Sequence, residues 1–422
     1  MAKTILVLSY YTNIPGACQA EWVDDRMFAF IEKGYSISLV SATCCFTHTR
    51  PEIEHYKVPT LSPHGATYEY NERIRNKIPV KKGILFAYTW LMPKIDRVLQ
   101  AIHLRSGEGR WTWFISAFLT ALYRVNNKKD IAFVYSTGGP PSAHIAAILF
   151  ARIYGKKIIC EFQDPLSGDD IGRHKLSRIG LKFFEKIIIR YATITIYCTR
   201  NAMLYARKQY PGYAQKIDYV YPGSNAVEHY QQSDRNIPGK SGNRKINITY
   251  LGSLYQTRNL DTTMQALSEL IESGKSPAIE INIYGVMNTD IRERIVNFPH
   301  PGFIFLHNLV TREMAMQKAL EADVLLLIQH KDKRSIPTMP FKIYDYLHTG
   351  NLIFGLIYRN DEIEEILVSH GHLVCQADDV EGIKEKLLLI SGSFNNLPQN
   401  IRKSDLTPEK AVERILQLLN QM

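Results

Sequence analysis

Short apolar runs alternate with amphipathic stretches from the beginning of the chain. Residues 3–9 form an apolar run, residues 21–33 carry apolar side chains at helical spacing, and residues 35–40 are apolar again. Apolar strands joined by helices are typical of a parallel sheet that is covered on both faces. The opening of the sequence therefore predicts a strand, a helix that ends at Gly34, and a second strand.

The same alternation continues in two series. The first predicts strands at 131–136, 156–162, 194–198 and 216–220 and helices at 142–153 and 179–191. The second predicts strands at 246–251, 279–284, 303–306, 324–328 and 352–356 and helices at 260–273, 312–322, 341–349 and 408–421. Residues 50–125 are less regular and predict no defined element.

The stretch 221–245 separates the two series, and its Pro, Gly, Ser, Asn and charged residues are typical of a loop. We therefore expect an N-terminal Rossmann-like domain at 1–223, a linker at 224–245, a C-terminal Rossmann-like domain at 246–404 and a helix at 405–422 that returns to the N-terminal domain. The predicted fold class is α/β, with two doubly wound sheets facing each other across a cleft. In such sheets ligands bind at the carboxyl ends of the strands.

The charge is distributed unevenly between the two halves of the chain. Residues 1–223 hold 30 Lys and Arg against 17 Asp and Glu, a balance of +13, and the remaining residues hold 21 against 24, a balance of −3. The N-terminal half is therefore expected to face an anionic partner such as a membrane surface, a phosphate-bearing acceptor or nucleic acid. Nucleic acid is the weakest of these, because no zinc finger, RNP pattern or basic helix-turn-helix signature is present.

One predicted helix carries cations at every fourth position. Arg178, Lys182, Lys186 and Arg190 would share one face, which is either solvated or in contact with lipid. Residues 73–124 add further cations together with Trp90, Trp111 and Trp113 (and Phe114). Basic residues interleaved with tryptophan suit a membrane interface, although the tryptophans fit a protein core equally well.

The chain is expected to be cytoplasmic, at the inner face of the membrane. No window holds the ~20 apolar residues that a spanning helix needs. The six cysteines show no C-x-x-C spacing and no disulfide framework, which suits a reducing compartment.

The stretch YLGSLYQTR at 250–258 lies between a predicted strand and a predicted helix. Gly252 allows the backbone to approach a ligand closely, and the following helix directs its N–H groups at the turn. Arg258 adds a bidentate donor for diphosphate oxygens. In isolation, a tight turn with a solvated arginine explains the stretch as well.

A second stretch, IPTMPFKIYDYLHTG at 336–350, predicts a helix that begins after Pro340 and ends at Gly350. Lys342 in the first turn opposes the helix dipole unless an anion is present. Asp345 lies three residues further on, and a carboxylate beside a phosphate site accepts hydrogen bonds from ribose hydroxyls. An exposed Lys–Asp pair is the alternative.

Together these stretches resemble the donor domain of GT-B glycosyltransferases, in particular the retaining family-4 group. YYTNIPGACQA at 10–20 resembles that group's Pro-Gly-Gly loop, and FVYSTGGPPSAH with CEFQDPLSGD resembles a stretch of its bacterial polysaccharide members. The ordered series runs from about residue 3 to residue 390.

The resemblance implies a role for individual residues. Arg258 and Lys342 correspond to groups that bind the diphosphate, and Asp164, with Gln163 beside it, lies where acceptor-side polar groups are found. Asp164, Arg258 and Lys342 are the implied catalytic residues. The implied donor contacts are Gly16, Gly252, Ser253, Arg258, Tyr284, Gly285, Asn308, Leu309, Pro340, Lys342 and Asp345, with His307 beside them.

Three positions depart from the family pattern. The first acid of its Glu-x7-Glu motif falls at Pro337, the lysine that usually follows the diphosphate arginine is Asn259, and the second glycine of the N-terminal loop is Ala17. Lys342 is the candidate replacement for the missing cation.

The resemblance implies a hexosyltransferase that acts with retention and needs neither a metal nor another cofactor. Its donor would be a nucleoside-diphosphate sugar, and its acceptor a lipid-linked or growing surface glycan such as lipopolysaccharide or capsule. A GT-B-type sugar-nucleotide epimerase and a non-catalytic partner subunit remain open as alternatives. A dehydrogenase is disfavoured because no G-x-G-x-x-G turn is present. His144 and His348 are either catalytic or structural.

Overall fold

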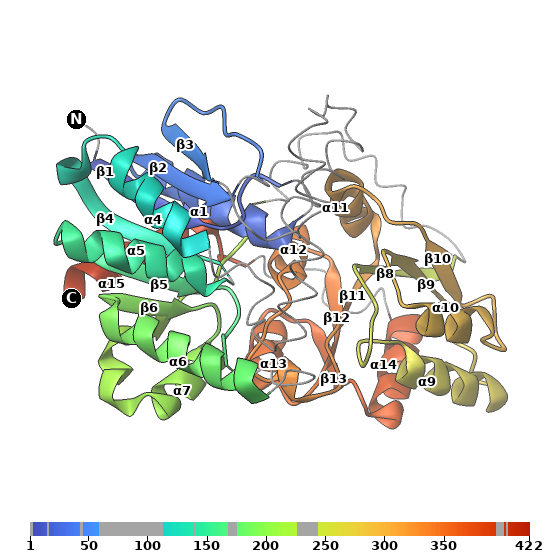
Figure 1. Cartoon of the computed structure of the whole chain (residues 1–422). Helices are drawn as coiled ribbons and strands as arrows, with labels where there is room; N and C mark the ends of the chain where they lie inside the picture. The colour runs from blue at the N-terminus through green and yellow to red at the C-terminus, as the bar shows by residue number, and fades with distance from the viewer. Residues whose placement is uncertain are drawn as a thin grey trace. The chain divides into compact units, whose positions relative to one another are not determined.

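The computed structural model describes residues 3–14, 17–42, 45–58, 113–138, 140–167, 175–225, 244–393, 401 and 404–422. The chain forms two compact units. Unit 1 comprises residues 1–222 together with 408–422, and unit 2 comprises residues 223–407. Each unit contains one parallel sheet, and Figure 1 shows both. The fold class is thus α/β with two Rossmann-like units.

The sheet of unit 1 has seven strands in the order β3-β2-β1-β4-β5-β6-β7, all parallel. Its strands are β1 (Lys3–Ser9), β2 (Tyr35–Ala42), β3 (Ile53–Val58), β4 (Ile131–Thr137), β5 (Ile158–Phe162), β6 (Ile194–Tyr197) and β7 (Ile217–Tyr219). The order reverses between β1 and β4, so the crevice for ligands is expected beyond their carboxyl ends.

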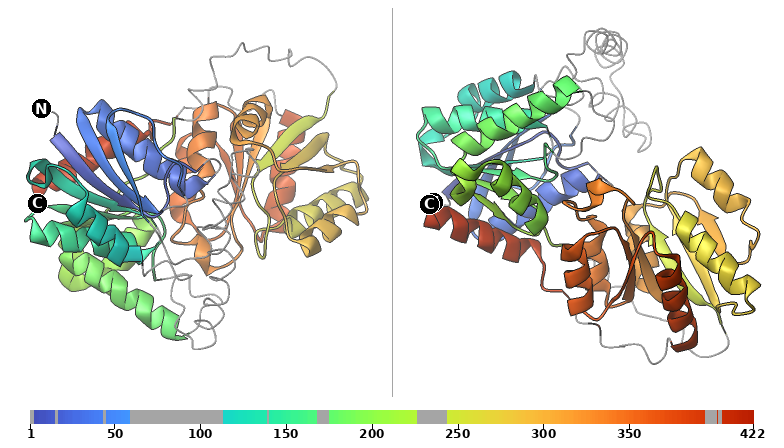
Figure 2. Two further views of the ribbon diagram at one scale, coloured as in Figure 1. Left: turned by 45° about the horizontal axis from the view of Figure 1, so that its top comes forward. Right: turned by 90° about the horizontal axis from the view of Figure 1, so that it is seen from below.

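Helices cover both faces of this sheet (Figures 1 and 2). The first face packs against α4 (Trp113–Tyr123), α5 (Pro141–Ile153), α6 (Lys175–Tyr191) and α7 (Arg200–Gln209). The second packs against α1 (Cys18–Glu32) and α15 (Pro408–Gln421). The last helix of the chain therefore belongs to unit 1.

The sheet of unit 2 has six parallel strands in the order β10-β9-β8-β11-β12-β13. Its strands are β8 (Ile246–Leu251), β9 (Ile279–Tyr284), β10 (Ile304–His307), β11 (Val324–Ile328), β12 (Leu352–Ile357) and β13 (Leu373–Gln376). The switch point lies between β8 and β11. Two layers of helices flank the sheet, with α9 (Asp261–Glu272), α10 (Thr289–Val296) and α14 (Val380–Ser393) in one and α11 (Arg312–Glu321), α12 (Lys342–Thr349) and α13 (Asp361–Ser369) in the other.

The described parts of the region predicted to lack regular elements contain β3 and α4. Helix α4 escapes a periodicity search because its sequence, WFISAFLTALY, has no charged face. Trp113 is 1% exposed and packs edge-on against Tyr10, with ring centroids 5.4 Å apart. The suggestion that Trp113 contacts a membrane is therefore wrong, whereas Trp90 and Trp111 lie outside the described residues. Among the described helices, none is long and apolar enough to span a membrane.

Candidate functional site

Two glycines hold the turns after β8 and β9 against each other. Gly252 donates its N–H to the carbonyl of Tyr284 at 2.9 Å, and a Cβ on Gly285 would lie 2.2 Å from the Gly252 carbonyl oxygen. Both glycines have positive φ, +135° and +149°. Only residues without a Cβ allow the two turns to approach this closely. The result is a close backbone contact at the carboxyl edge of the sheet, and the exposed Ser253 follows it.

Lys342 lies over this contact. Its Nζ donates to the Leu251 carbonyl at 2.5 Å and sits 4.1 Å from the centre of the Tyr250 ring. A Cβ on Gly252 would collide with that Nζ at 2.4 Å, so the glycine makes room for the cation. Pro340 precedes the helix, and its carbonyl accepts the N–H of Ile343 at 3.0 Å.

Arg258 closes a tight hairpin that follows β8. Tyr255 and Arg258 exchange backbone hydrogen bonds of 3.0 Å in both directions, and Gln256 between them has a φ of 51°. The guanidinium lies 5.3 Å from the centre of the Tyr255 ring. Its Nε is buried and has no hydrogen-bond partner among the described residues. A buried donor of this kind can bind an anion.

The loop after β11 lies against the same hairpin. Thr257 donates to Asp332 and contacts His330 Nδ1 at 3.1 Å. Asp332 also accepts hydrogen bonds of 2.9 Å and 2.7 Å from Arg334, which hold the pKa of its carboxyl below the usual range. Burial, aided by the charges of Arg258 and Arg334, lowers the pKa of His330 to about 4. Asp332 is thus engaged by Arg334, and no described carboxylate forms an ion pair with Arg258.

The last residues of β9 and β10 form an aromatic pair. The rings of Tyr284 and His307 stack at 4.2 Å with an interplanar angle of 9°. His307 Nε2 contacts Asn282 Oδ1 at 2.7 Å, and burial lowers the pKa of the imidazole. Asn308 and Leu309 follow on the surface, with Leu309 65% exposed.

Asp345, the residue predicted to contact ribose, is almost completely buried. Its Oδ1 accepts hydrogen bonds from Ser224 at 2.6 Å and from Arg312 at 3.1 Å, and the residue is 4% exposed. One carboxylate oxygen is therefore occupied by protein donors.

Of the positions that depart from the pattern of family-4 glycosyltransferases, Asn259 has a clear local role. Asn259 Oδ1 accepts the N–H of Asp261 at 3.2 Å, so this side chain supports the start of α9 where the family has a cation. Pro337 lies half-buried in the loop before α12.

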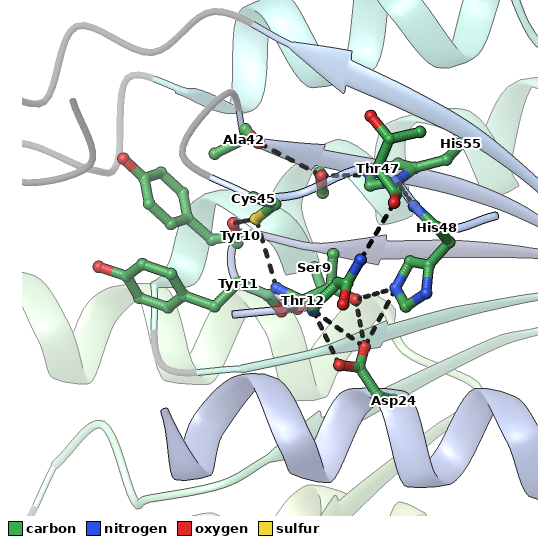
Figure 3. Close-up of polar contacts among 12 residues, drawn as sticks. Ser9, Tyr10, Tyr11, Thr12, Asp24, Ala42, Cys45, Thr47, His48 and His55 are labelled. Carbon is green, nitrogen blue, oxygen red and sulfur yellow. Dashed lines mark hydrogen bonds and ion pairs between the residues drawn. The ribbon is translucent and has the colours of Figure 1, made fainter. Parts of the chain in front are cut away.

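In unit 1 the predicted phosphate-contacting Gly16 lies outside the described residues. The segment leading to it is fixed by Asp24 of α1, as Figure 3 shows. Asp24 accepts the N–H of Asn13 at 2.8 Å and the hydroxyl of Thr12 at 2.5 Å. Asn13 has a φ of 45°, so the chain turns sharply here. This network was not predicted, because its members are joined only by the packing of α1 against the sheet.

Two histidines extend the network (Figure 3). His48 Nε2 lies 3.0 Å from Thr12 Oγ1 and 3.2 Å from Asp24 Oδ1. His55 Nδ1 accepts the backbone N–H of His48 at 3.1 Å, and its Nε2 contacts Ser41 at 2.7 Å. Burial, followed by the charges of His48 and Lys57, lowers the pKa of His55 to about 3.

Asp164 is exposed just after β5, while Gln163 beside it is buried. Gln163 Nε2 donates to the Gln19 carbonyl at 3.0 Å, and its Oε1 has no partner among the described residues. Within β5, Glu161 forms a buried ion pair with Arg26 at 3.0 Å. These contacts join β5 to α1.

His144 and His348 have structural surroundings. His144 is fully buried between Ser136 at 2.8 Å and the Gly138 carbonyl at 3.2 Å, and burial lowers its pKa to about 4. His348 Nε2 contacts the Leu406 carbonyl at 3.0 Å. In the described part of the chain, no group of three or more His, Cys, Asp or Glu could hold a metal ion.

Comparisons with known proteins identify the fold but no sequence family. No family model and no curated protein matches the sequence. Among solved structures, Anabaena HepE in complex with UDP-glucose matches with a TM-score of 0.58 at 10% identity, covering 99% of this chain and 100% of that one. S. aureus TarM in complex with UDP matches with a TM-score of 0.59 at 10% identity over 100% of both chains.

A third match is a putative UDP-N-acetylglucosamine 2-epimerase from Listeria monocytogenes, with a TM-score of 0.53 at 13% identity, covering 100% of this chain and 96% of that one. At these identities the likeness concerns the fold alone. The chain has the two-unit α/β fold of GT-B proteins, a fold shared by nucleotide-sugar glycosyltransferases and sugar-nucleotide epimerases.

Proposed function

We propose that the chain is a glycosyltransferase that moves a sugar from a nucleoside-diphosphate sugar to a lipid-linked or growing glycan, with retention at the anomeric carbon. The observation that carries the proposal is the edge between β8 and β11 in unit 2. There Lys342 covers the glycine backbone, and Arg258 keeps a buried donor that has no partner among the described residues. This arrangement suits a diphosphate.

The proposed roles follow from the chemistry of these groups. Cleavage of the donor leaves negative charge on the diphosphate, and Arg258 and Lys342 would stabilise that charge as it develops. The stacked Tyr284–His307 pair offers an apolar face beside Gly285 for the nucleotide base. Asp345 would contact the ribose through Oδ2, because Oδ1 already accepts two hydrogen bonds.

The solved structures support a nucleotide-sugar donor. HepE was solved with UDP-glucose and TarM with UDP, and both share the fold of this chain. Asp164 and Gln163 after β5 are the proposed acceptor-side groups, since they lie at a carboxyl strand end in unit 1.

A sugar-nucleotide epimerase is the second candidate, supported by the match to the Listeria protein. An epimerase converts the nucleotide sugar without an acceptor, so one experiment separates the two. The chain is incubated with radiolabelled nucleotide sugars, with and without a bacterial lipid extract. Label that moves into the lipid fraction supports the transferase. Conversion into a different, still intact nucleotide sugar in the absence of lipid would overturn it in favour of the epimerase.

A further inference from the structure

Four helices on the first face of the unit 1 sheet carry positive charge almost exclusively. Helices α4, α5, α6 and α7, which we term the basic layer, contain one acidic residue, Glu185. Glu185 is 2% exposed and accepts hydrogen bonds from Tyr197 and Tyr210, both at 2.9 Å. The cations of the layer are Arg152, Lys175, Arg178, Lys182, Lys186, Arg190, Arg200, Arg207 and Lys208.

The outer surface of the basic layer is also rich in large apolar side chains. Phe183 and Ile179 of α6 are 60% and 57% exposed, and Ile153 at the end of α5 is 58% exposed. The exposed apolar side chains of the layer are Ile115, Leu119, Tyr123, Leu149, Ile153, Ile179, Phe183, Tyr191, Leu204 and Tyr205. Large apolar residues gathered on one surface mark an interaction site more often than a solvated one.

Several cations of the basic layer have no acidic partner in the part of the chain that the structure describes. Within the described ranges, no carboxylate forms an ion pair with Arg152, Lys182, Lys186 or Arg190. Arg152 and Arg190 lie on the ring of Tyr191, at 4.8 Å and 5.3 Å from its centre. The surface therefore combines uncompensated positive charge with exposed hydrocarbon.

The other face of the same sheet provides an internal comparison. Helices α1 and α15 carry acidic and basic residues side by side, and Lys33 beside α1 forms an ion pair of 2.5 Å with Glu413 of α15. Their large apolar residues are mostly buried in the core. The charge and apolar exposure of the basic layer are thus not a general property of unit 1.

We propose that the basic layer docks unit 1 on an anionic lipid bilayer. The cations would lie at the level of the phosphate headgroups, and Ile153, Ile179 and Phe183 would enter the interfacial region between them. A polynucleotide would satisfy the cations but offers no apolar environment for the aliphatic side chains of Ile153 and Ile179. The inference does not depend on the reaction that the chain catalyses.

The test is co-sedimentation of the full chain with vesicles of phosphatidylcholine alone and of phosphatidylcholine mixed with phosphatidylglycerol. We expect binding only to the anionic vesicles and weaker binding as salt rises. The double variant Lys182→Gln/Lys186→Gln should bind about 25-fold more weakly, about fivefold for each cation. Lys410→Gln/Arg414→Gln on α15 removes the same charge from the opposite face and should bind like the unaltered chain.

Apolar insertion is tested separately with Phe183→Ser, for which Val368→Ser on the exposed surface of α13 is the control. Phe183→Ser should weaken vesicle binding and Val368→Ser should not, with unchanged circular dichroism for both. Equal losses for the two double variants would overturn the proposal, as would failure to bind anionic vesicles. Binding to duplex DNA or RNA that depends on Lys182 and Lys186 but not on Phe183, without vesicle binding, would favour a nucleic-acid partner instead.

Discussion

The guanidinium of Arg258 keeps a buried Nε without a hydrogen-bond partner among the described residues, although Tyr255 and Thr257 of its hairpin are well connected. Leaving such a donor unsatisfied costs about 1–3 kcal/mol, which a bound anion would recover. Arg258→Ala should lower nucleotide-sugar turnover by about 10²–10³-fold, the usual loss on removing a charge-stabilising donor.

The control for this variant is Arg294→Ala, which removes a cation from the same unit. Arg294 is a partly exposed residue of α10 whose charge is already matched by ion pairs with Asp261 and Asp290, both at 3.0 Å. Its turnover should equal that of the unaltered chain, and both variants should melt within a few degrees of it. Undiminished turnover in Arg258→Ala would remove this residue from the site.

Gly285 offers a test of the backbone packing at the same edge. A Cβ here would lie 2.2 Å from the Gly252 carbonyl oxygen, at a φ of +149°. Gly285→Ala should reduce the free energy of unfolding by ~3 kcal/mol or more, because clash and strained φ combine. Gly274→Ala, at a φ of +75° with nothing within 4 Å, should cost only about 1 kcal/mol. Denaturant unfolding measures both, and equal costs would show that the two turns separate without penalty.

At the level of elements, α1 fixes the segment that follows β1. Asp24 accepts hydrogen bonds from Thr12 and Asn13, so Asp24→Ala should leave the Asn13 N–H unsatisfied. Hydrogen exchange in residues 10–14 should become faster, and turnover should fall if this segment positions the donor. Glu32→Ala, an exposed change of the same charge at the end of α1, should affect neither. Unchanged exchange in Asp24→Ala would show that other contacts hold the segment.

Periodicity predicted most elements that carry a clear polar–apolar pattern. The predicted strand 3–9 and helix 408–421 have the same bounds as β1 and α15. The uncharged α4 and the edge strand β3 were not predicted. Also missed were α7, α10, α13, β13 and α14, although α7 and α13 are amphipathic.

The candidate site was predictable only where a motif is local. Gly252, Arg258 and Lys342 lie in recognisable stretches, and their placement on one edge follows from the strand order. The contact between Gly252 and Gly285 depends on the pairing of β8 with β9, and the contact of Thr257 with Asp332 depends on β11 lying beside β8. Such contacts have no signature in a single sequence.

At the scale of the whole molecule, histidines that are shielded from solvent link stability to pH. Burial is the main cause that lowers the pKa of His144 and His330 to about 4, and that of His55 and His372 to about 3. In the unfolded chain these groups titrate near 6.5. Below that value the unfolded state binds protons that the folded state excludes, so stability should decrease as pH falls from about 6.5 toward 4.

Thermal unfolding at pH 7.5, 6.0 and 5.0 measures this dependence, with each histidine contributing up to about 1.4 kcal/mol per pH unit. His144→Gln should reduce the slope of the free energy of unfolding against pH by the contribution of about one proton. A melting temperature that is constant or rises toward pH 5 would contradict the neutral state of these side chains in the folded chain.

The central claim is that the edge of unit 2 between β8 and β11 binds a nucleoside diphosphate. The most direct measurement is a thermal-shift titration of the full chain and of Arg258→Ala with UDP, GDP, ADP, TDP and CMP. We predict that one nucleoside diphosphate stabilises the unaltered chain, by about 2.7 kcal/mol at 100 times its dissociation constant, and that Arg258→Ala loses this effect. Stabilisation by none of the nucleotides, or equal stabilisation of both proteins, would contradict the account.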